Sequence, residues 1–259
     1  MSTTRVFADE LRVAYEHGRR NFRHWDLSYA DLRGLRIPGA CLYGANLHGA
    51  DLRESDLTNA DLRTADLWRA QLAGAVLIGA ELIDANLARA DLSRANLCDA
   101  ELQRAVLHGA NLTEASLINA SLHSVDLSGA NMQDAVLTGA DLENANLEGA
   151  CLVDSDLRNV NMEEADLSGA NLRGANLPQA DLIGADLEGA DLTDADLSSA
   201  DLEQADLRGA KLTSAGLQHA DLRCADFGGA DMTDVSLRGA NLHDVDLAGT
   251  CLERRGRQR

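Results

Sequence analysis

The chain of 259 residues has few of the side chains that fill ordinary protein cores: aromatic residues make up 3%, and there are only two prolines. Leu and Ala supply most of the apolar mass, which argues against a core of varied, interlocking side chains. Its five cysteines are odd in number and form no CxxC pair; they are Cys41, Cys98, Cys151, Cys224 and Cys251. Neither a disulfide framework nor a zinc site is indicated, and reduced thiols are expected.

Long apolar runs are missing as well. No stretch approaches the roughly 18 residues of a membrane span, and the first twenty residues lack the apolar centre of a signal peptide. We therefore expect a soluble, cytoplasmic protein.

Signs of catalysis are also scarce. The sequence has no glycine-rich phosphate loop and no nucleophile elbow. The seven histidines are dispersed, and His48 and His108 would lie about 14 Å apart in the fold argued below, too far to share a metal ion. We expect no catalytic residue, no metal, no cofactor and no enzymatic activity.

What the sequence does have is a period of five. From Phe22 to Leu252 every fifth residue, here numbered i, is Leu, Ile, Met or Phe, giving 47 pentapeptides without an insertion. Ala stands at i−2 in most of them, and Asp or Asn is common at i−1. Five residues advance about 500° on an α-helix, and an odd period sends alternate residues to opposite faces of a strand. The chain must therefore turn a corner once per pentapeptide, with i and i−2 inside.

Glycine at i+2 predicts how many corners make one coil. It recurs with a period of 20 at Gly49, Gly109, Gly129, Gly149, Gly169, Gly189, Gly209, Gly229 and Gly249. This period predicts four corners per coil, with glycine favoured at the corner that needs a positive φ. Coils at about 4.8 Å each would build a rod about 55 Å long.

The Ala-(Asp/Asn)-Leu-X-X pattern, as in ADL at 180–182, resembles the pentapeptide repeat family over residues 20–252. Known members form right-handed quadrilateral β-helices. The resemblance therefore implies an all-β, right-handed quadrilateral β-helix of about 11 to 12 coils. The segment LRVAYEHGRRNF at 11–22 is also similar to the opening of cyanobacterial members.

The two ends differ from the repeat. Residues 1–19 are predicted to form an N-terminal capping helix, because apolar residues lie at helical spacing at Phe7, Leu11, Ala14 and Tyr15. The core of the first coils is expected to be enlarged by Trp25, Tyr29 and Leu35. Residues 253–259 read as a basic flexible tail without an apolar face. The resemblance also allows a homodimer through the C-terminal coil, since topoisomerase-protecting members of the family dimerise at that end.

The formal charge of −19 is unevenly placed. Residues 1–100 carry 14 acids and 12 bases, whereas residues 101–252 carry 27 acids and 7 bases. Direct nucleic-acid binding is disfavoured. The acidic stripe, as we name it, is formed by Asp166, Asp186, Asp206, Asp226 and Asp246 in one i−1 column, with Asp181, Asp201, Asp221 and Glu188 beside it.

The acidic half would carry about one net charge per 1.8 Å of rod, against about 1.7 Å for duplex DNA. Family members that protect DNA gyrase or topoisomerase IV are thought to act by DNA mimicry. The resemblance therefore implies a protein partner of that class, although this chain lacks the projecting loops of some of those proteins. The alternative is that Asp at i−1 is only the repeat consensus and serves solubility.

Two further surfaces are candidates for protein contact. An apolar strip is formed by Val76, Ile78, Cys98, Ile118 and Val136; it marks a docking site or reflects only the fit of β-branched residues to strands. Trp68 lies beside Arg69 and Arg89, and it serves as an interface anchor or lies flat on its neighbours. A regulatory scaffold, as in cyanobacterial members that restrain differentiation signalling, and a chain without specific activity are the alternative functions.

Overall fold

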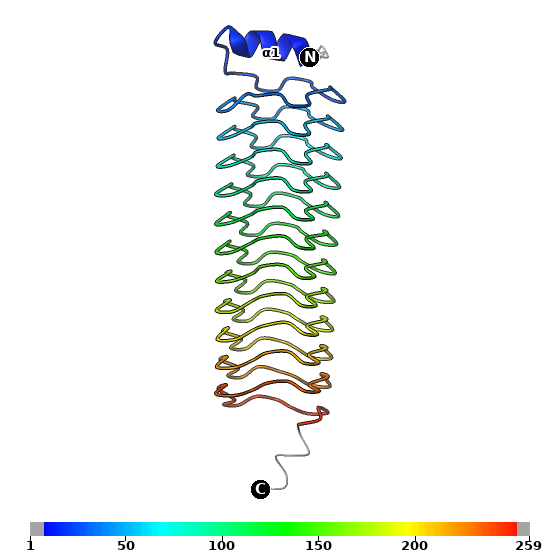
Figure 1. Cartoon of the computed structure of the whole chain (residues 1–259), viewed down its shortest axis with the longest axis vertical. Helices are drawn as coiled ribbons and strands as arrows, with labels where there is room; N and C mark the ends of the chain where they lie inside the picture. The colour runs from blue at the N-terminus through cyan, green and yellow to red at the C-terminus, as the bar shows by residue number, and fades with distance from the viewer. Residues whose placement is uncertain (1–7, 253–259) are drawn as a thin grey trace.

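The computed structural model describes residues 8–252 and contains one helix, α1 (Ala8–Glu16). This helix lies across the N-terminal end of a long stack of coils (Figure 1). Leu11 is fully buried, and Tyr15 packs partly buried against the core while its hydroxyl donates to the carbonyl of Pro38 over 2.8 Å. The helical spacing thus predicted the cap, whereas Phe7 lies outside the described residues.

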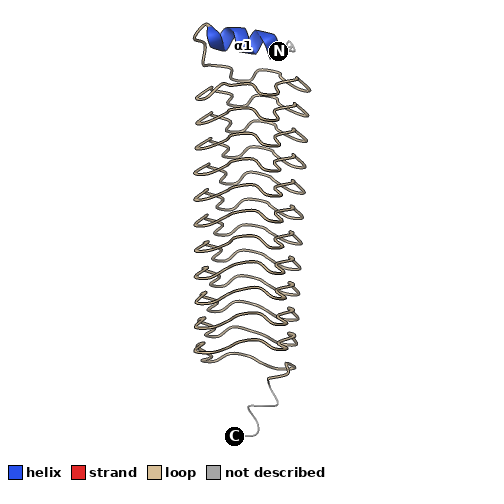
Figure 2. Ribbon diagram, in the orientation of Figure 1, coloured by secondary structure: helices blue, strands red, loops and turns tan. Residues whose placement is uncertain are grey.

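Parallel bridges connect each coil to the next. Each i−1 residue pairs with the residue 20 positions later, from Asn21 with Cys41 to Asp226 with Asp246. Four pentapeptides therefore complete one coil, as the glycine period predicted. Each side contributes a single bridge residue because the corners take up the rest, so residues 8–252 show no longer strand (Figure 2).

The corners all share one backbone conformation. Every i+2 residue from His24 to Gly249 has a positive φ, with Arg69 at 54° and Gly169 at 62°. At most corners the next i−2 N–H donates to the central carbonyl, as Ala30 does to Leu27 over 3.1 Å. The expectation that one glycine-rich corner alone needs positive φ is therefore wrong, because all four corners need it.

The interior is a column of Leu and Ala. Every central residue from Phe22 to Met232 is buried, and nearly every i−2 Ala is buried beside it. Burial of one Leu side chain contributes roughly 1.5–3 kcal/mol, so stability accumulates coil by coil. Leu35 is buried and Trp25 partly buried, as expected, but Tyr29 is 64% exposed because it occupies an outward i+2 position.

Burial declines in the last described coils. Leu237 and Leu247 are only partly buried, and Leu242 is 42% exposed. The predicted basic tail, residues 253–259, lies outside the described part of the chain. Within residues 8–252, no helix has the length and apolar character needed to cross a membrane.

Candidate protein-binding surfaces

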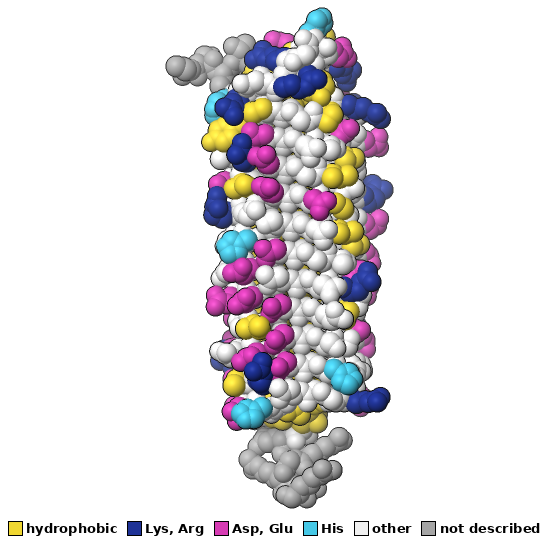
Figure 3. All heavy atoms as spheres, turned by 90° about the vertical axis from the view of Figure 1, so that its left-hand side faces the viewer, with side chains coloured by type: hydrophobic (Ala, Val, Ile, Leu, Met, Phe, Trp, Pro, Cys, Tyr) yellow, Lys and Arg dark blue, Asp and Glu magenta, His cyan; other side chains and the backbone are white. Residues whose placement is uncertain are grey.

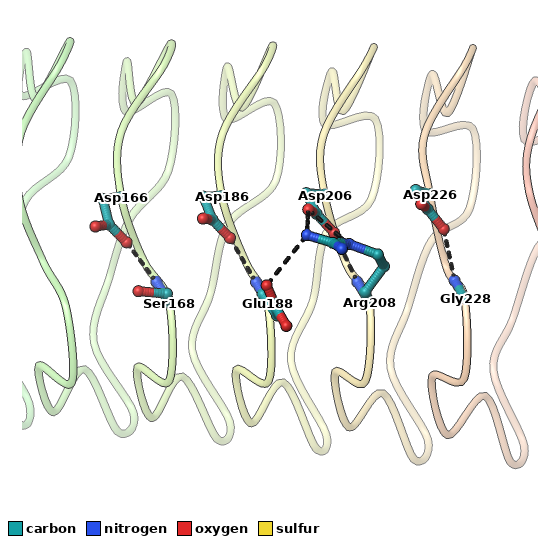
Figure 4. Close-up of polar contacts among 8 residues, drawn as sticks. All are labelled: Asp166, Ser168, Asp186, Glu188, Asp206, Arg208, Asp226 and Gly228. Carbon is teal, nitrogen blue, oxygen red and sulfur yellow. Dashed lines mark hydrogen bonds and ion pairs between the residues drawn. The ribbon is translucent and has the colours of Figure 1, made fainter.

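The carboxylates of the acidic stripe project from consecutive coils and are held by their own turns (Figure 4). Asp166 accepts the backbone N–H of Ser168 over 2.9 Å, and Asp186 accepts that of Glu188 over 2.8 Å. Asp226 and Asp246 make the same contact over 2.8 Å with the residues two positions later. This bond explains why Asp and Asn recur at i−1, since either side chain offers the accepting oxygen.

Neutral Asn interrupts the Asp columns elsewhere on the rod. Asn46 donates its side-chain amide to Asp26, and Asn86 to Asp66, each over 3.0 Å from one coil to the preceding one. The column from Asp166 to Asp246 has no Asn in five consecutive coils. Like charges about 4.8 Å apart therefore follow one another there without amide donors between them.

Two arginines pair with three members of the stripe, Asp206, Asp221 and Glu188. Arg208 donates its Nε to Asp206 over 2.8 Å, and this hydrogen bond lowers the pKa of Asp206 below its usual range. Arg223 pairs with Asp221 over 2.9 Å. Within residues 8–252, no ion pair reaches the remaining aspartates, which are Asp166, Asp186, Asp226, Asp246, Asp181 and Asp201.

One part of the stripe brings three carboxylates together. Oxygens of Asp186, Glu188 and Asp206 lie within 4.8 Å of one another. Arg208 occupies this cluster, because it donates to Glu188 over 3.1 Å as well as to Asp206. A guanidinium group thus already balances the charge that a cation would balance.

The apolar strip lies along one edge of the rod. Ile78, Cys98 and Ile118 occupy the same position in three consecutive coils, and Val76 and Val136 lie two residues before that column. All five side chains are half-buried, and Cys98 Sγ lies 3.1 Å from Ser116 Oγ. Figure 3 shows hydrophobic side chains along one edge of the N-terminal half and acidic ones gathered most densely over the C-terminal half.

Trp68 belongs to a stack of rings that sequence reasoning did not find. The ring of His48 lies 4.5 Å from that of Trp68 and 5.1 Å from that of Tyr29, centroid to centroid. The guanidinium of Arg69 lies 4.2 Å over the Trp68 ring. We call Tyr29, His48, Trp68, Arg69 and Arg89 the aromatic–arginine patch. The 20-residue step from His48 to Trp68 was the signal available in the sequence.

The patch and the acidic stripe share one side of the rod. Asp66, two residues before Trp68, belongs to the bridge column that runs from Asp26 to Asp246. The same side thus carries rings and arginines towards α1 and aspartates towards the C-terminal end.

A shallow hollow of about 620 Å³ opens between α1 and the first coils. It is lined by Asp9, Arg12, Asp31, Arg33, Arg53 and other residues. Arg33 pairs with Asp31 over 2.6 Å, and this hydrogen bond lowers the pKa of Asp31 to about 2. Arg53 pairs with Asp51 over 2.6 Å, so both arginines that the first coils contribute to this hollow are held in ion pairs.

These features define a class: a four-sided parallel β-solenoid, covered at one end by a helix, with a polar outer surface. Models of the pentapeptide repeats match residues 21–254 in overlapping segments, so the chain belongs to the pentapeptide repeat family. Members of this family fold as right-handed quadrilateral β-helices and are generally structural or binding proteins.

Solved structures of the family are similar to this chain. HetL, a protein involved in heterocyst differentiation regulation from a Nostoc cyanobacterium, is 33% identical, with 95% of this chain and 96% of HetL covered and a TM-score of 0.43. QnrB1, a plasmid-mediated fluoroquinolone resistance protein, is 20% identical, with 80% of this chain and 91% of QnrB1 covered and a TM-score of 0.35. No curated protein matches the chain.

Proposed function

We propose that this solenoid is a non-enzymatic, cytoplasmic binding protein whose acidic half imitates duplex DNA on a type II topoisomerase, either DNA gyrase or topoisomerase IV. The observation that carries the proposal is the column of five aspartates from Asp166 to Asp246, in which no Asn alternates with Asp. If the aspartates served solubility alone, this column would not have to lack Asn, because the mixture of Asp and Asn in the other coils already supplies polar side chains.

Charge spacing supports the mimicry. Residues 101–252 carry 27 acids and 7 bases, which over roughly 36 Å of rod amounts to about one net charge per 1.8 Å. The carboxylates are fixed by backbone N–H groups of their own turns, as in Asp186 and Glu188. A DNA-binding groove would therefore meet a preorganised row of anions, with little side-chain ordering left to occur on binding.

The decisive experiment removes charge while keeping the turn. Asn in place of Asp166, Asp186, Asp226 and Asp246 retains an oxygen that accepts the turn N–H and removes four negative charges. We expect this quadruple variant to lose binding to purified gyrase or topoisomerase IV at least about tenfold, and wild-type binding to fall steeply with added salt. Binding and inhibition of supercoiling are the measurements.

A control carries the same substitution at three positions outside the stripe. Asp→Asn at Asp26, Asp66 and Asp126 changes the same bridge column outside the stripe and is expected to leave topoisomerase binding nearly unchanged. Equal losses in both variants would show that bulk charge alone matters. An unchanged affinity in the quadruple variant would refute the proposal.

A second candidate function is a regulatory scaffold that docks a protein on the apolar strip. The supporting observation is the row of half-buried Ile78, Cys98 and Ile118 in consecutive coils. Lys in place of Ile78 and Ile118 should abolish capture of such a partner with little salt dependence, while the Asp→Asn variants should still bind it. If the variant with both Lys substitutions still captures the partner protein, docking on the apolar strip is excluded.

We also propose that the last coil supports a homodimer. Leu242 is 42% exposed there, and an exposed apolar coil end favours association. Leu242→Arg should abolish end-to-end pairs, which small-angle X-ray scattering detects as particles about twice as long as one rod; such long particles persisting in the variant would exclude this contact.

A further inference from the structure

The aromatic–arginine patch contains two arginines without a carboxylate partner. Seven other arginines of the described residues pair with Asp or Glu, among them Arg104 with Asp84 over 2.6 Å and Arg158 with Asp156 over 2.6 Å, whereas Arg36 and Arg94 have no ion pair either. Within residues 8–252, no ion pair includes Arg69 or Arg89, and the Arg69 guanidinium lies over the Trp68 ring. Tyr, Trp and Arg are the residues enriched at the energetic centres of protein interfaces.

Both arginines project from a corner that is otherwise nearly bare. Arg69 and Arg89 stand in the i+2 column that begins with Tyr29, and every later member, from Gly109 to Gly249, is glycine. A Cβ added at Gly129, Gly149, Gly169, Gly189 or Gly209 would meet nothing within 4 Å. Packing does not require these glycines, and other corners carry Asp, Glu or Arg at similar φ. The run of glycine is therefore not imposed by packing inside the rod. Without side chains at this corner, a second molecule can approach the backbone closely.

The acidic stripe flanks this bare corner. Asp186 and Glu188 precede Gly189, and Asp206 precedes Gly209. Arginines and carboxylates recur with the same repeat of about 4.8 Å along the rod, because both are set by the coil. Two rods placed antiparallel along this corner bring the arginines of each against the carboxylates of the other in matching steps.

We propose that two copies of this chain associate side by side and antiparallel, with the aromatic–arginine patch of each copy lying against the acidic stripe of the other. Full overlap of the two corner columns places Arg69 against Gly209, Arg89 against Gly189 and Tyr29 against Gly249. The arrangement is isologous, so each dimer contains the contact twice.

Charge and area both favour this orientation. Residues 1–100 are nearly neutral and residues 101–252 strongly acidic, so a parallel pair would stack the two acidic halves, whereas an antiparallel pair separates them. The accessible surface of 11548 Å² is spread over four long sides. One side thus exceeds the about 800 Å² per partner that a stable interface buries.

This inference goes beyond the proposed function, since it does not require a topoisomerase. It also links self-association to the proposed function, because a second copy and a DNA-binding partner would compete for the same carboxylates. Self-association would then lower the concentration of free acidic stripe.

A charge-swap experiment tests the pairing. The R69E/R89E variant makes the patch acidic, and the D186R/D206R variant makes the stripe basic. Both are compatible with the fold, because Glu54 already occupies an i+2 corner and Arg36 an i−1 position. Each variant alone should self-associate at least about tenfold more weakly than wild type in sedimentation velocity, and an equimolar mixture should form a heterodimer of nearly wild-type affinity.

Shape distinguishes this dimer from an end-to-end one. Leu242→Arg removes the proposed end contact, and small-angle X-ray scattering of this variant should still give a dimer with nearly the length of one rod. A Leu242→Arg variant that is monomeric would overturn the proposal, as would an R69E/R89E variant that forms the short dimer like wild type. A wild-type chain that stays monomeric at about 0.5 mM would also overturn it and leave the patch to a different acidic partner.

Discussion

The side-chain amide of Asn46 donates a hydrogen bond to Asp26 in the preceding coil over 3.0 Å. One amide thereby replaces a charge and supplies a donor to the neighbouring carboxylate. No Asn occurs in the column from Asp166 to Asp246. The carboxylates of neighbouring coils therefore repel one another there more than in the rest of the column.

Asp186→Asn should therefore stabilise the protein. Removal of one charge between Asp166 and Asp206 should raise the free energy of unfolding by about 0.5–1 kcal/mol at low salt. Urea unfolding followed by circular dichroism is the measurement. The matched change, Asn46→Asp, should lower stability by a similar amount, and a loss of stability in Asp186→Asn would show that the aspartates are held by contacts beyond their own turns.

Two buried serines at i−2 provide a second comparison. Ser155 Oγ donates to the carbonyl of Leu152 over 2.7 Å, whereas Ser55 Oγ is buried without a partner. Ser55→Ala should raise the free energy of unfolding by about 1 kcal/mol, because an unpaired hydroxyl is removed from the core. Ser155→Ala should gain less, since a hydrogen bond is lost with it. Equal effects on the thermal midpoint would mean that Ser55 finds a partner in solution.

Gly169 tests the meaning of the bare corner. Its φ is 62°, and an added Cβ meets nothing within 4 Å. Gly169→Asn should cost no more than about 0.5 kcal/mol, because Asn tolerates this conformation, whereas Gly169→Val should cost about 1–2 kcal/mol. Chemical unfolding of the pair measures the difference, and a large loss with Asn would show that the backbone itself requires glycine there.

The Asp31 and Arg33 pair predicts a pH effect. Hydrogen bonding from Arg33 lowers the pKa of Asp31 to about 2, below the unfolded value of about 3.9. The folded state thus favours the ionised carboxylate, and the stability it contributes is present above pH 4 and is lost as the pH falls towards 2.

Arg33→Ala should return the pKa of Asp31 towards its ordinary value in a carboxyl carbon NMR titration. Arg53→Ala is the matched control, because Arg53 acts on Asp31 only through its charge and should produce a smaller rise. Equal shifts in both variants would contradict the hydrogen-bond cause.

The five-residue period alone was sufficient to predict the inward Leu and Ala, because only one arrangement of corners places both inside. The four-sided coil followed from the glycine period, although its physical reason was misread: positive φ is common to all corners, and glycine is merely one residue that accepts it. Tyr29 was expected in the core as a large aromatic residue, but its i+2 position points its side chain outward.

The surfaces were less accessible to sequence reasoning. Columns such as that of Asp166 could be read from 20-residue spacing. The stacking of His48 on Trp68 depends on side-chain torsions that spacing does not determine. Likewise, Arg208 and Asp206 are two residues apart, and only the turn between them brings the guanidinium to the carboxylate.

The corner conformation has a consequence for how such a chain can diverge. Thr64 is the only β-branched residue among the corners from His24 to Gly249, so the corners disfavour β-branched side chains but accept charged, polar and aromatic ones. Selection for a new partner can therefore alter a whole corner column, residue by residue, while the Leu and Ala interior stays the same. Interior positions thus determine stability and corner positions determine recognition, so related rods with similar cores can bind unrelated partners.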